Sequence, residues 1–146
     1  MKCEQWVHFS AGSFFNFNGT AGIWRKQTIE EVGGWNGRTT VEDMDLSLRT
    51  YVAGWRAVFV EDVCVPNELP SSYFAYRKQQ HRWTCGPVQL YRRASSSIWA
   101  SKLPWIRKFE ISIFYFLLRK TCSHFVSLGF FCFLVPLSVY TPEVDQ

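Results

Sequence analysis

The sequence predicts an α/β fold that is followed by an amphipathic helix and a transmembrane helix. Aromatic residues alternate with small or polar residues up to position 18, and residues 55–60 are mostly apolar, which is typical of short strands. Capping signals predict helices between and after these strands. Residues 122–140 carry no formal charge unless His124 is protonated, and this run of 19 residues is close to the ~20 that a bilayer span needs.

Composition narrows the classes of function. At 146 residues the chain is one domain or part of a larger one, and an aromatic share of 18% favours contact with carbohydrate, a membrane, or both. Between Arg77 and Lys120 there are ten Lys or Arg residues and one acid, Glu110. Such a block suits nucleic acid, anionic lipid or a phosphorylated substrate. No nucleic-acid-binding module is legible, and the apolar tail that follows favours a membrane partner.

The cysteines bear on the redox compartment of the protein, and the first residues bear on whether the chain starts with a signal peptide. Five scattered cysteines form no Cys-x-x-Cys motif and have no histidine at ligand spacing, so they support neither a disulfide framework nor a zinc site. We therefore expect a reducing compartment for the polar part. The first residues lead into no apolar run and show no secretory signal, so we expect the start to lie within a longer protein.

The first third of the chain predicts two strands and a helix. A strand over residues 1–18 leads into a small-residue turn at 18–22, and residues 23–25 form a second strand. Thr28 and Glu31 stand at capping-box spacing, which predicts a short helix that ends at Gly33 and Gly34.

The next helix begins near Thr40 and carries three acids at its start: Glu42, Asp43 and Asp45. For Asp43 two interpretations stay open. In the first, it completes a capping box with Thr40 and its negative charge interacts favourably with the helix dipole. In the second, it projects into a cleft as a general base. The dipole is expected to lower the pKa of this carboxylate and to make it a weaker base. We expect Asp45 to lie on the solvated face.

Strands at 55–60 and 63–65 are predicted to precede the amphipathic helix, for which Ser71 or Ser72 is the N-cap. Gly86 and Pro87 are expected to interrupt this helix, which then continues to about Arg93. Residues 95–104 are expected to form a linker.

In this amphipathic helix Gln79, Arg82 and Trp83 stand at i, i+3 and i+4, so an amide, a guanidinium and an indole share one face. A guanidinium fork suits a phosphate, and a broad aromatic ring suits the C–H face of a sugar. The alternative is that Arg82 and Trp83 form only a structural cation–π or core pair. Residues 79–83 taken alone favour this alternative, because short motifs match by chance.

The C-terminal residues 109–141 are predicted to associate with a membrane. Residues 111–118 suit the membrane interface, with Arg119 and Lys120 snorkelling at the boundary, and residues 122–140 suit a span. The alternative is a buried core helix, but residues 130–135 offer no polar face to water. The basic block would then lie on the cytosolic side.

Three ordered blocks resemble the processive family 2 glycosyltransferases, which include cellulose, chitin and hyaluronan synthases. The blocks are residues 17–22, residues 41–43, where Val41 replaces the threonine of a Thr-Glu-Asp motif, and Gln79-x-x-Arg82-Trp83, which matches Gln-x-x-Arg-Trp in full. Residues 38–46, 67–71 and 79–87 look like the plant cellulose synthase-like A proteins. Those are glucomannan 4-β-mannosyltransferases of the Golgi. The sister group, cellulose synthase-like C, shares the middle block.

The resemblance implies roles for the site residues. Asp43 would be the catalytic base, and Glu42 would orient the helix start. Gln79 and Arg82 would contact the donor pyrophosphate, while Trp83 would stack on the acceptor sugar. The acceptor pocket would be bordered by Asn18, Gly19 and Thr20.

The resemblance also implies an architecture and a reaction. Residues 1–70 would be the second half of a GT-A-type catalytic domain, 71–108 an amphipathic interface helix and linker, and 109–141 a segment with one transmembrane helix. Mannose, and also glucose, would pass from GDP-mannose or GDP-glucose to the non-reducing end of a β-1,4-linked (gluco)mannan chain, with inversion. The alternatives are an inactive membrane-associated fragment and a xyloglucan-type β-1,4-glucan synthase.

A metal is implied as well. The family holds Mg²⁺ or Mn²⁺ with an Asp-x-Asp motif in its nucleotide-binding half. No Asp-x-Asp precedes Asp43 here, so the metal ligands are expected in an N-terminal half outside this chain. Membrane lipid at the Golgi membrane is the remaining expected partner.

Overall fold

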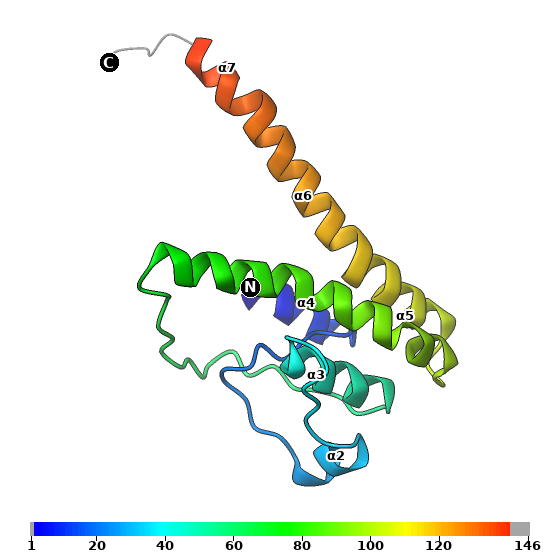
Figure 1. Ribbon diagram of the computed structural model, residues 1–146. Coiled ribbons are helices and arrows are strands. Elements are labelled where there is room, and N and C mark those ends of the chain that lie inside the picture. The colour runs from blue at the N-terminus through cyan, green and yellow to red at the C-terminus, as the bar shows by residue number, and fades with distance from the viewer. Residues whose placement is uncertain (1, 141–146) are drawn as a thin grey trace. The chain divides into compact units, whose positions relative to one another are not determined.

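The computed structural model describes residues 2–140, and the chain divides into two compact units after Lys108. Position 1, where the first expected domain begins, and position 141, where the last one ends, lie outside the described residues. The first unit begins with α1 (Lys2–Ser10), followed by α2 (Lys26–Glu31), α3 (Glu42–Val52) and α4 (Tyr73–Ala100), the last three of which are labelled in Figure 1. The short helix α5 (Trp105–Phe109) follows them and ends one residue beyond the boundary.

Residues 2–140 contain no β-strand, so the expected α/β fold is not confirmed. The first predicted strand was wrong, because Lys2–Ser10 form helix α1. Residues 55–60 and 63–65 are not helical, but they pair with no other strand in the described chain. Alternation creates one apolar face, whereas a strand also needs a neighbour for its backbone hydrogen bonds.

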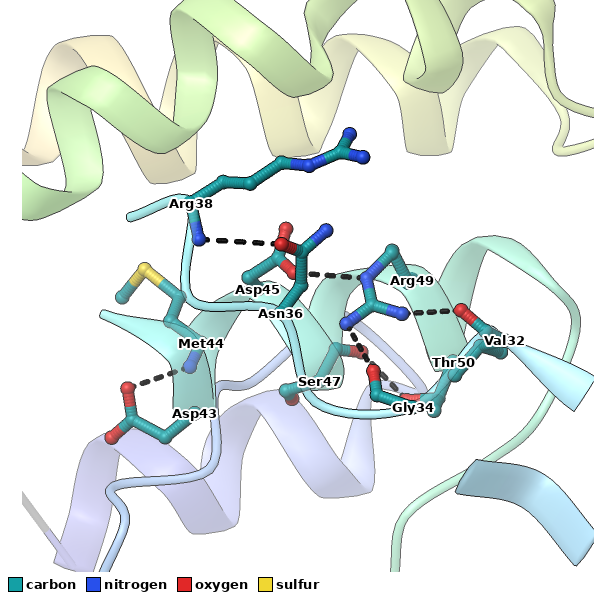
Figure 2. A network of polar contacts seen from close by, with 10 residues as sticks. All are labelled: Val32, Gly34, Asn36, Arg38, Asp43, Met44, Asp45, Ser47, Arg49 and Thr50. Carbon is teal, nitrogen blue, oxygen red and sulfur yellow. Dashed lines mark hydrogen bonds and ion pairs between the residues drawn. The ribbon is translucent and has the colours of Figure 1, made fainter. Parts of the chain in front are cut away.

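Helix α2 ends in a tight turn that is fastened to α3. The predicted capping box was wrong: Arg25 is the N-cap without a side-chain cap, and Thr28 is buried within the helix. The predicted stop is confirmed by Gly33 and Gly34, whose φ values of 82° and 74° suit glycine. Arg49 of α3 donates hydrogen bonds to the carbonyl oxygens of Val32 and Gly34, which fixes the turn (Figure 2).

The buried residues of helix α3 are Leu46, Ser47, Leu48 and Thr50. Its N-cap is Val41 and not the expected Thr40, and no side chain caps it. The capping box there was therefore wrong. Gly54, with φ of 97°, follows the C-terminus of the helix.

The segment of residues 12–19 lies antiparallel along α3. The Tyr51 hydroxyl donates to the Gly12 carbonyl oxygen at 3.2 Å. One turn earlier in α3, the Ser47 Oγ accepts from the Phe17 backbone N–H at 3.2 Å and donates to the Phe15 carbonyl at 3.3 Å. These bonds satisfy backbone groups that a sheet would otherwise pair, and they direct the segment toward the start of α3.

Helix α4 is longer than predicted. The Ser72 side chain caps it by accepting from the Ala75 N–H at 3.2 Å, which confirms one of the two candidate caps. The predicted interruption at Gly86 and Pro87 was wrong, because both are buried inside a continuous helix that runs to Ala100. The expected linker is consequently helical over most of its length. Buried packing outweighs the hydrogen bond that Pro87 cannot donate.

The second unit is a succession of helical segments (Figure 1): η1 (Glu110–Leu118), α6 (Arg119–Gly129), η2 (Phe130–Leu134) and α7 (Val135–Tyr140). Large apolar side chains are exposed in its second half, among them Phe125, Phe131 and Phe133. None of the helices within residues 2–140 has both the length and the apolar character needed to cross a bilayer, so the expected span is not confirmed. The snorkelling expected of Arg119 and Lys120 concerns side chains outside the described part of the structure.

Candidate active site

Asp43 lies in the first turn of α3 with its carboxylate half-buried. Its Oδ1 accepts a hydrogen bond of 2.7 Å from the backbone N–H of Met44 (Figure 2). On the other side, the backbone of Gly19 approaches so closely that a Cβ atom there would be 2.8 Å from Oδ2 of Asp43. The loop that contains Asn18, Gly19 and Thr20 therefore borders this carboxylate directly.

Burial is the main influence on the charge of Asp43. Loss of solvent raises the pKa of the Asp43 carboxyl above its ordinary value, and the neighbouring Glu42 charge raises it further. The Met44 N–H and the Arg82 guanidinium act in the opposite direction and hold the pKa down. The expectation of a lowered pKa was wrong, because desolvation at this helix start exceeds the stabilisation by backbone dipoles. Asp43 is thus a stronger base than an ordinary aspartate.

Helix α4 brings the Gln-x-x-Arg-Trp motif to the same place. Arg82 is close enough to act electrostatically on Asp43. One turn further along α4, Gly86 packs against Val41, the N-cap of α3, and a Cβ atom at position 86 would lie 2.4 Å from Val41 Cγ1. Gln79, Arg82 and Gly86 stand at i, i+3 and i+7, so the helical repeat places all three on the face that approaches α3.

The remaining motif residues differ in exposure. Gln79 is half-buried, whereas Trp83 keeps 49% of its surface exposed. An indole that is half open to solvent and fixed on a helix is available for stacking. Arg82 is exposed as well.

The other predicted residues lie around this centre. The Asn18 Oδ1 accepts a hydrogen bond of 3.0 Å from Asn16 Nδ2, which holds its side chain against the loop. Thr20 is exposed beside Gly19. Glu42 is the exposed first residue of α3 and acts on Asp43 through its charge.

Three supporting residues were missed by the sequence reasoning. Ser47 bonds the segment before Gly19 to α3, and its only signal in the sequence was a serine between two leucines. Asp45 was expected in solvent, but it forms an ion pair of 2.9 Å with Arg49, and both side chains are largely buried. Gly86 was interpreted as a helix breaker, although a glycine inside a helix also marks close packing.

The metal ligands were expected outside this chain, and the residues that the structure describes can be tested for a site of their own. Within the described residues there is no group of three or more His, Cys, Asp or Glu side chains that could hold an ion. Of its single Asp-x-Asp, Asp43 accepts from Met44 while Asp45 is paired with Arg49. These carboxylates are engaged separately, so the residues present do not fit a divalent cation.

Comparison with known proteins gives a consistent picture. The profile described as Glycosyl transferase family group 2 matches residues 2–141. Glucomannan 4-beta-mannosyltransferase 1 of Cyamopsis tetragonoloba is 49% identical over 143 residues, which are 97% of this chain and 27% of that relative. Probable glucomannan 4-beta-mannosyltransferase 11 of Arabidopsis thaliana is 50% identical over 134 residues, 91% of this chain and 30% of that relative. No solved structure matches the chain.

These matches confirm the resemblance that the three motifs predicted. The chain spans 27% and 30% of the length of the two relatives just named. It therefore corresponds to one part of such proteins, and the part is the one that contains Asp43, Arg82 and Trp83.

Proposed function

The chain belongs to the glycosyl transferase family group 2, and from that premise we propose that it forms the acceptor side of a glucomannan 4-β-mannosyltransferase. The donor is GDP-mannose, with GDP-glucose as a second donor, and the acceptor is a β-1,4-linked glycan. The observation that carries the proposal is the juxtaposition of Asp43, Gly19 and Arg82, three residues of separate motifs, around one half-buried carboxylate.

Asp43 is the general base of the proposed reaction. It takes the proton of the acceptor's terminal hydroxyl while that oxygen forms a bond to the anomeric carbon of the donor sugar. The bond from the anomeric carbon to the diphosphate breaks, and its electron pair leaves with the nucleoside diphosphate. Attack from the side opposite the leaving group inverts the configuration. A raised pKa suits this task, since proton transfer is most effective when the pKa of the base is near the working pH.

Arg82 and Trp83 have separate tasks on the same face of α4. The Arg82 guanidinium offers a fixed positive charge to the diphosphate, with Gln79 beside it as a hydrogen-bonding group. The half-exposed Trp83 offers its ring to the acceptor sugar. The loop with Asn18, Gly19 and Thr20 closes the acceptor pocket on the other side of Asp43.

We also propose that the chain contributes to an α/β domain of the GT-A type. Valines at positions 58, 60, 63 and 65 are exposed in segments that are not helical, which supports strands whose sheet is completed by residues outside this chain. Mg²⁺ or Mn²⁺, held by ligands outside this chain, would supply charge neutralisation for the diphosphate.

The exposed apolar side chains of the second unit support a membrane-embedded helix at residues 122–140. We therefore propose that the protein lies at the Golgi membrane with lipid as its partner.

The proposal is tested with the full chain expressed in microsomes. GDP-[¹⁴C]mannose and a β-1,4-mannan oligosaccharide are supplied, and the labelled product is digested with a β-1,4-mannanase. We expect label in mannanase-sensitive polymer in the parent chain and none in Asp43→Asn. Absence of Asp43-dependent product would identify the chain as an inactive fragment, and incorporation from UDP-glucose alone would identify a glucan synthase.

A binding experiment tests the acceptor side without turnover. Mannohexaose is titrated into the chain in detergent micelles while the intrinsic tryptophan fluorescence is recorded. We expect a saturable change that is lost in Trp83→Leu and retained in Trp99→Leu, an equally exposed tryptophan on the same helix. A response that both variants retain would contradict the role of Trp83.

A further inference from the structure

At Gly86, helix α4 approaches the residues that lead into α3 very closely. A Cβ atom on Gly86 would lie 2.4 Å from Val41 Cγ1, 3.0 Å from Val41 Cγ2 and 3.1 Å from Thr40 Oγ1. Real Cβ atoms essentially never come within 3.0 Å of a heavy atom that is not their neighbour in the chain. Val41 is a β-branched residue that is only 7% exposed, so it has little freedom to turn away.

The glycine is used here for contact and not for backbone freedom. Gly86 lies inside α4 and has no positive φ, so its conformation is open to any residue. Glycine is unfavourable in a helix interior relative to alanine. Gly129 offers a comparison, because it also lies in a helix and would meet no atom within 4 Å if it carried a Cβ.

The contact lies between the two halves of the candidate active site. Arg82 and Trp83 precede Gly86 by four and three residues, so they project from the same side of α4 one turn away. Val41 precedes Asp43 by two residues and is the N-cap of its helix. The separation of the two backbones at Gly86 therefore sets how closely Arg82 and Trp83 approach the Asp43 carboxylate.

We propose that Gly86 is a positioning residue for glycosyl transfer, because its lack of a side chain seats α4 against Val41 and so holds Arg82 and Trp83 over Asp43. Its catalytic consequence depends on the function proposed above, whereas its structural consequence does not. A side chain at position 86 separates the helices, and truncation of Val41 restores the space that the new Cβ needs.

Four variants of the full chain test this: Gly86→Ala, Val41→Ala, the double variant Val41→Ala/Gly86→Ala, and Gly129→Ala as the matched control. Val41→Ala removes Cγ1 and Cγ2, the two atoms nearest to the new Cβ. The control adds a methyl group to a helical glycine in open space, so it reports any general effect of the Gly-to-Ala change.

The first readout does not require activity. Aspartate labelled with ¹³C at the side-chain carboxyl is titrated by NMR in detergent micelles, and Asp43 is assigned with Asp43→Asn. With Gly86 in place, Arg82→Gln is expected to raise the pKa of Asp43, because the guanidinium holds it down. We expect this upward shift to shrink in the Gly86→Ala background, to return in the double variant, and to persist in Gly129→Ala.

The second readout is mannosyl transfer in microsomes. We expect kcat to fall about 10- to 100-fold in Gly86→Ala, since small displacements of catalytic groups have effects of that order, and to recover in the double variant. The KM for GDP-mannose should change less than kcat.

The outcomes separate the two proposals. A parent chain without Asp43-dependent transfer would defeat the proposed function, while the Arg82–Asp43 coupling would still decide the role of Gly86. Full coupling in Gly86→Ala would overturn the inference. So would a double variant that regains its helical circular dichroism without regaining the coupling, since Gly86 would then serve folding alone.

Discussion

The backbone of Gly19 lies against the carboxylate of Asp43, although 23 residues separate them in the chain. A side chain on Gly19 would place its Cβ 2.8 Å from Oδ2, and the φ of 77° at this position is one that other residues adopt only with strain. The loop at residues 18–20 therefore fits closely against the start of α3 at the proposed catalytic base.

Gly19→Ala is expected to combine strain with a clash. The left-handed conformation should cost ~1–2 kcal/mol of stability, and displacement of the carboxylate should lower mannosyl transfer about 100-fold. Gly33→Ala is the matched control, because Gly33 has φ of 82° and no neighbour within 4 Å of its Cβ position. Urea unfolding and transfer assays should show similar stability losses in both variants but an activity loss in Gly19→Ala alone. Equal activity would exclude a role for the Gly19–Asp43 contact.

Asp43→Asn is expected to raise stability at neutral pH while it abolishes transfer. Since the pKa of Asp43 is raised in the folded chain, the protonated acid stabilises the fold below the ordinary aspartate pKa. That contribution disappears as the pH rises through the raised pKa, and the ionised carboxylate is unfavourable at pH 7. Asparagine keeps an oxygen for the Met44 N–H without the charge. Urea unfolding followed by circular dichroism should show the variant more stable at pH 7 and the difference vanishing near pH 3; a less stable variant at pH 7 would contradict this.

Arg49→Met should remove the anchor of the turn after α2. The guanidinium bonds Asp45 at 2.9 Å and the Gly34 carbonyl at 2.7 Å, in addition to the Val32 carbonyl (Figure 2). Loss of these bonds to a charged group should cost ~2–3 kcal/mol in urea unfolding. Arg49→Lys should not restore it, because an ammonium lacks the planar fork.

A control for that prediction is the pair between Lys26 and Glu30. It is 3.6 Å long, with side chains 89% and 64% exposed, compared with 26% and 15% for Arg49 and Asp45. Lys26→Met should therefore cost under ~0.5 kcal/mol. A comparable loss in both variants would show that burial does not determine the strength of these pairs.

Ser47→Ala should loosen the segment that leads to Gly19. The hydroxyl accepts from the Phe17 N–H and donates to the Phe15 carbonyl, so its removal leaves two backbone groups unpaired. We expect a loss of ~1–3 kcal/mol and faster amide hydrogen exchange at Phe17. Ser10→Ala, which removes one exposed hydroxyl bond to the Val7 carbonyl, should change neither quantity measurably. Unchanged exchange at Phe17 in Ser47→Ala would show that Ser47 does not hold the segment.

Local signals predicted several helix ends but missed helix α1 and misplaced both capping boxes. The stop at Gly33, the cap at Ser72 and the acids that open α3 depend on a few neighbouring residues, so they are readable from sequence. The strands failed because a strand depends on a partner, and residues 12–19 found helix α3 in place of one. The break at Gly86 failed because buried packing outweighs local propensity.

The sequence by itself determined the family, because the motifs at 41–43 and 79–83 carry the residues proposed for catalysis and binding at short and regular spacing. Only the tertiary structure decided that Gly86 seats against Val41, that Gly19 lies on Asp43, and that the pKa of Asp43 is raised. Those properties depend on backbone separation and loss of solvent between segments more than twenty residues apart. Such distances are set by packing and leave no mark on local spacing.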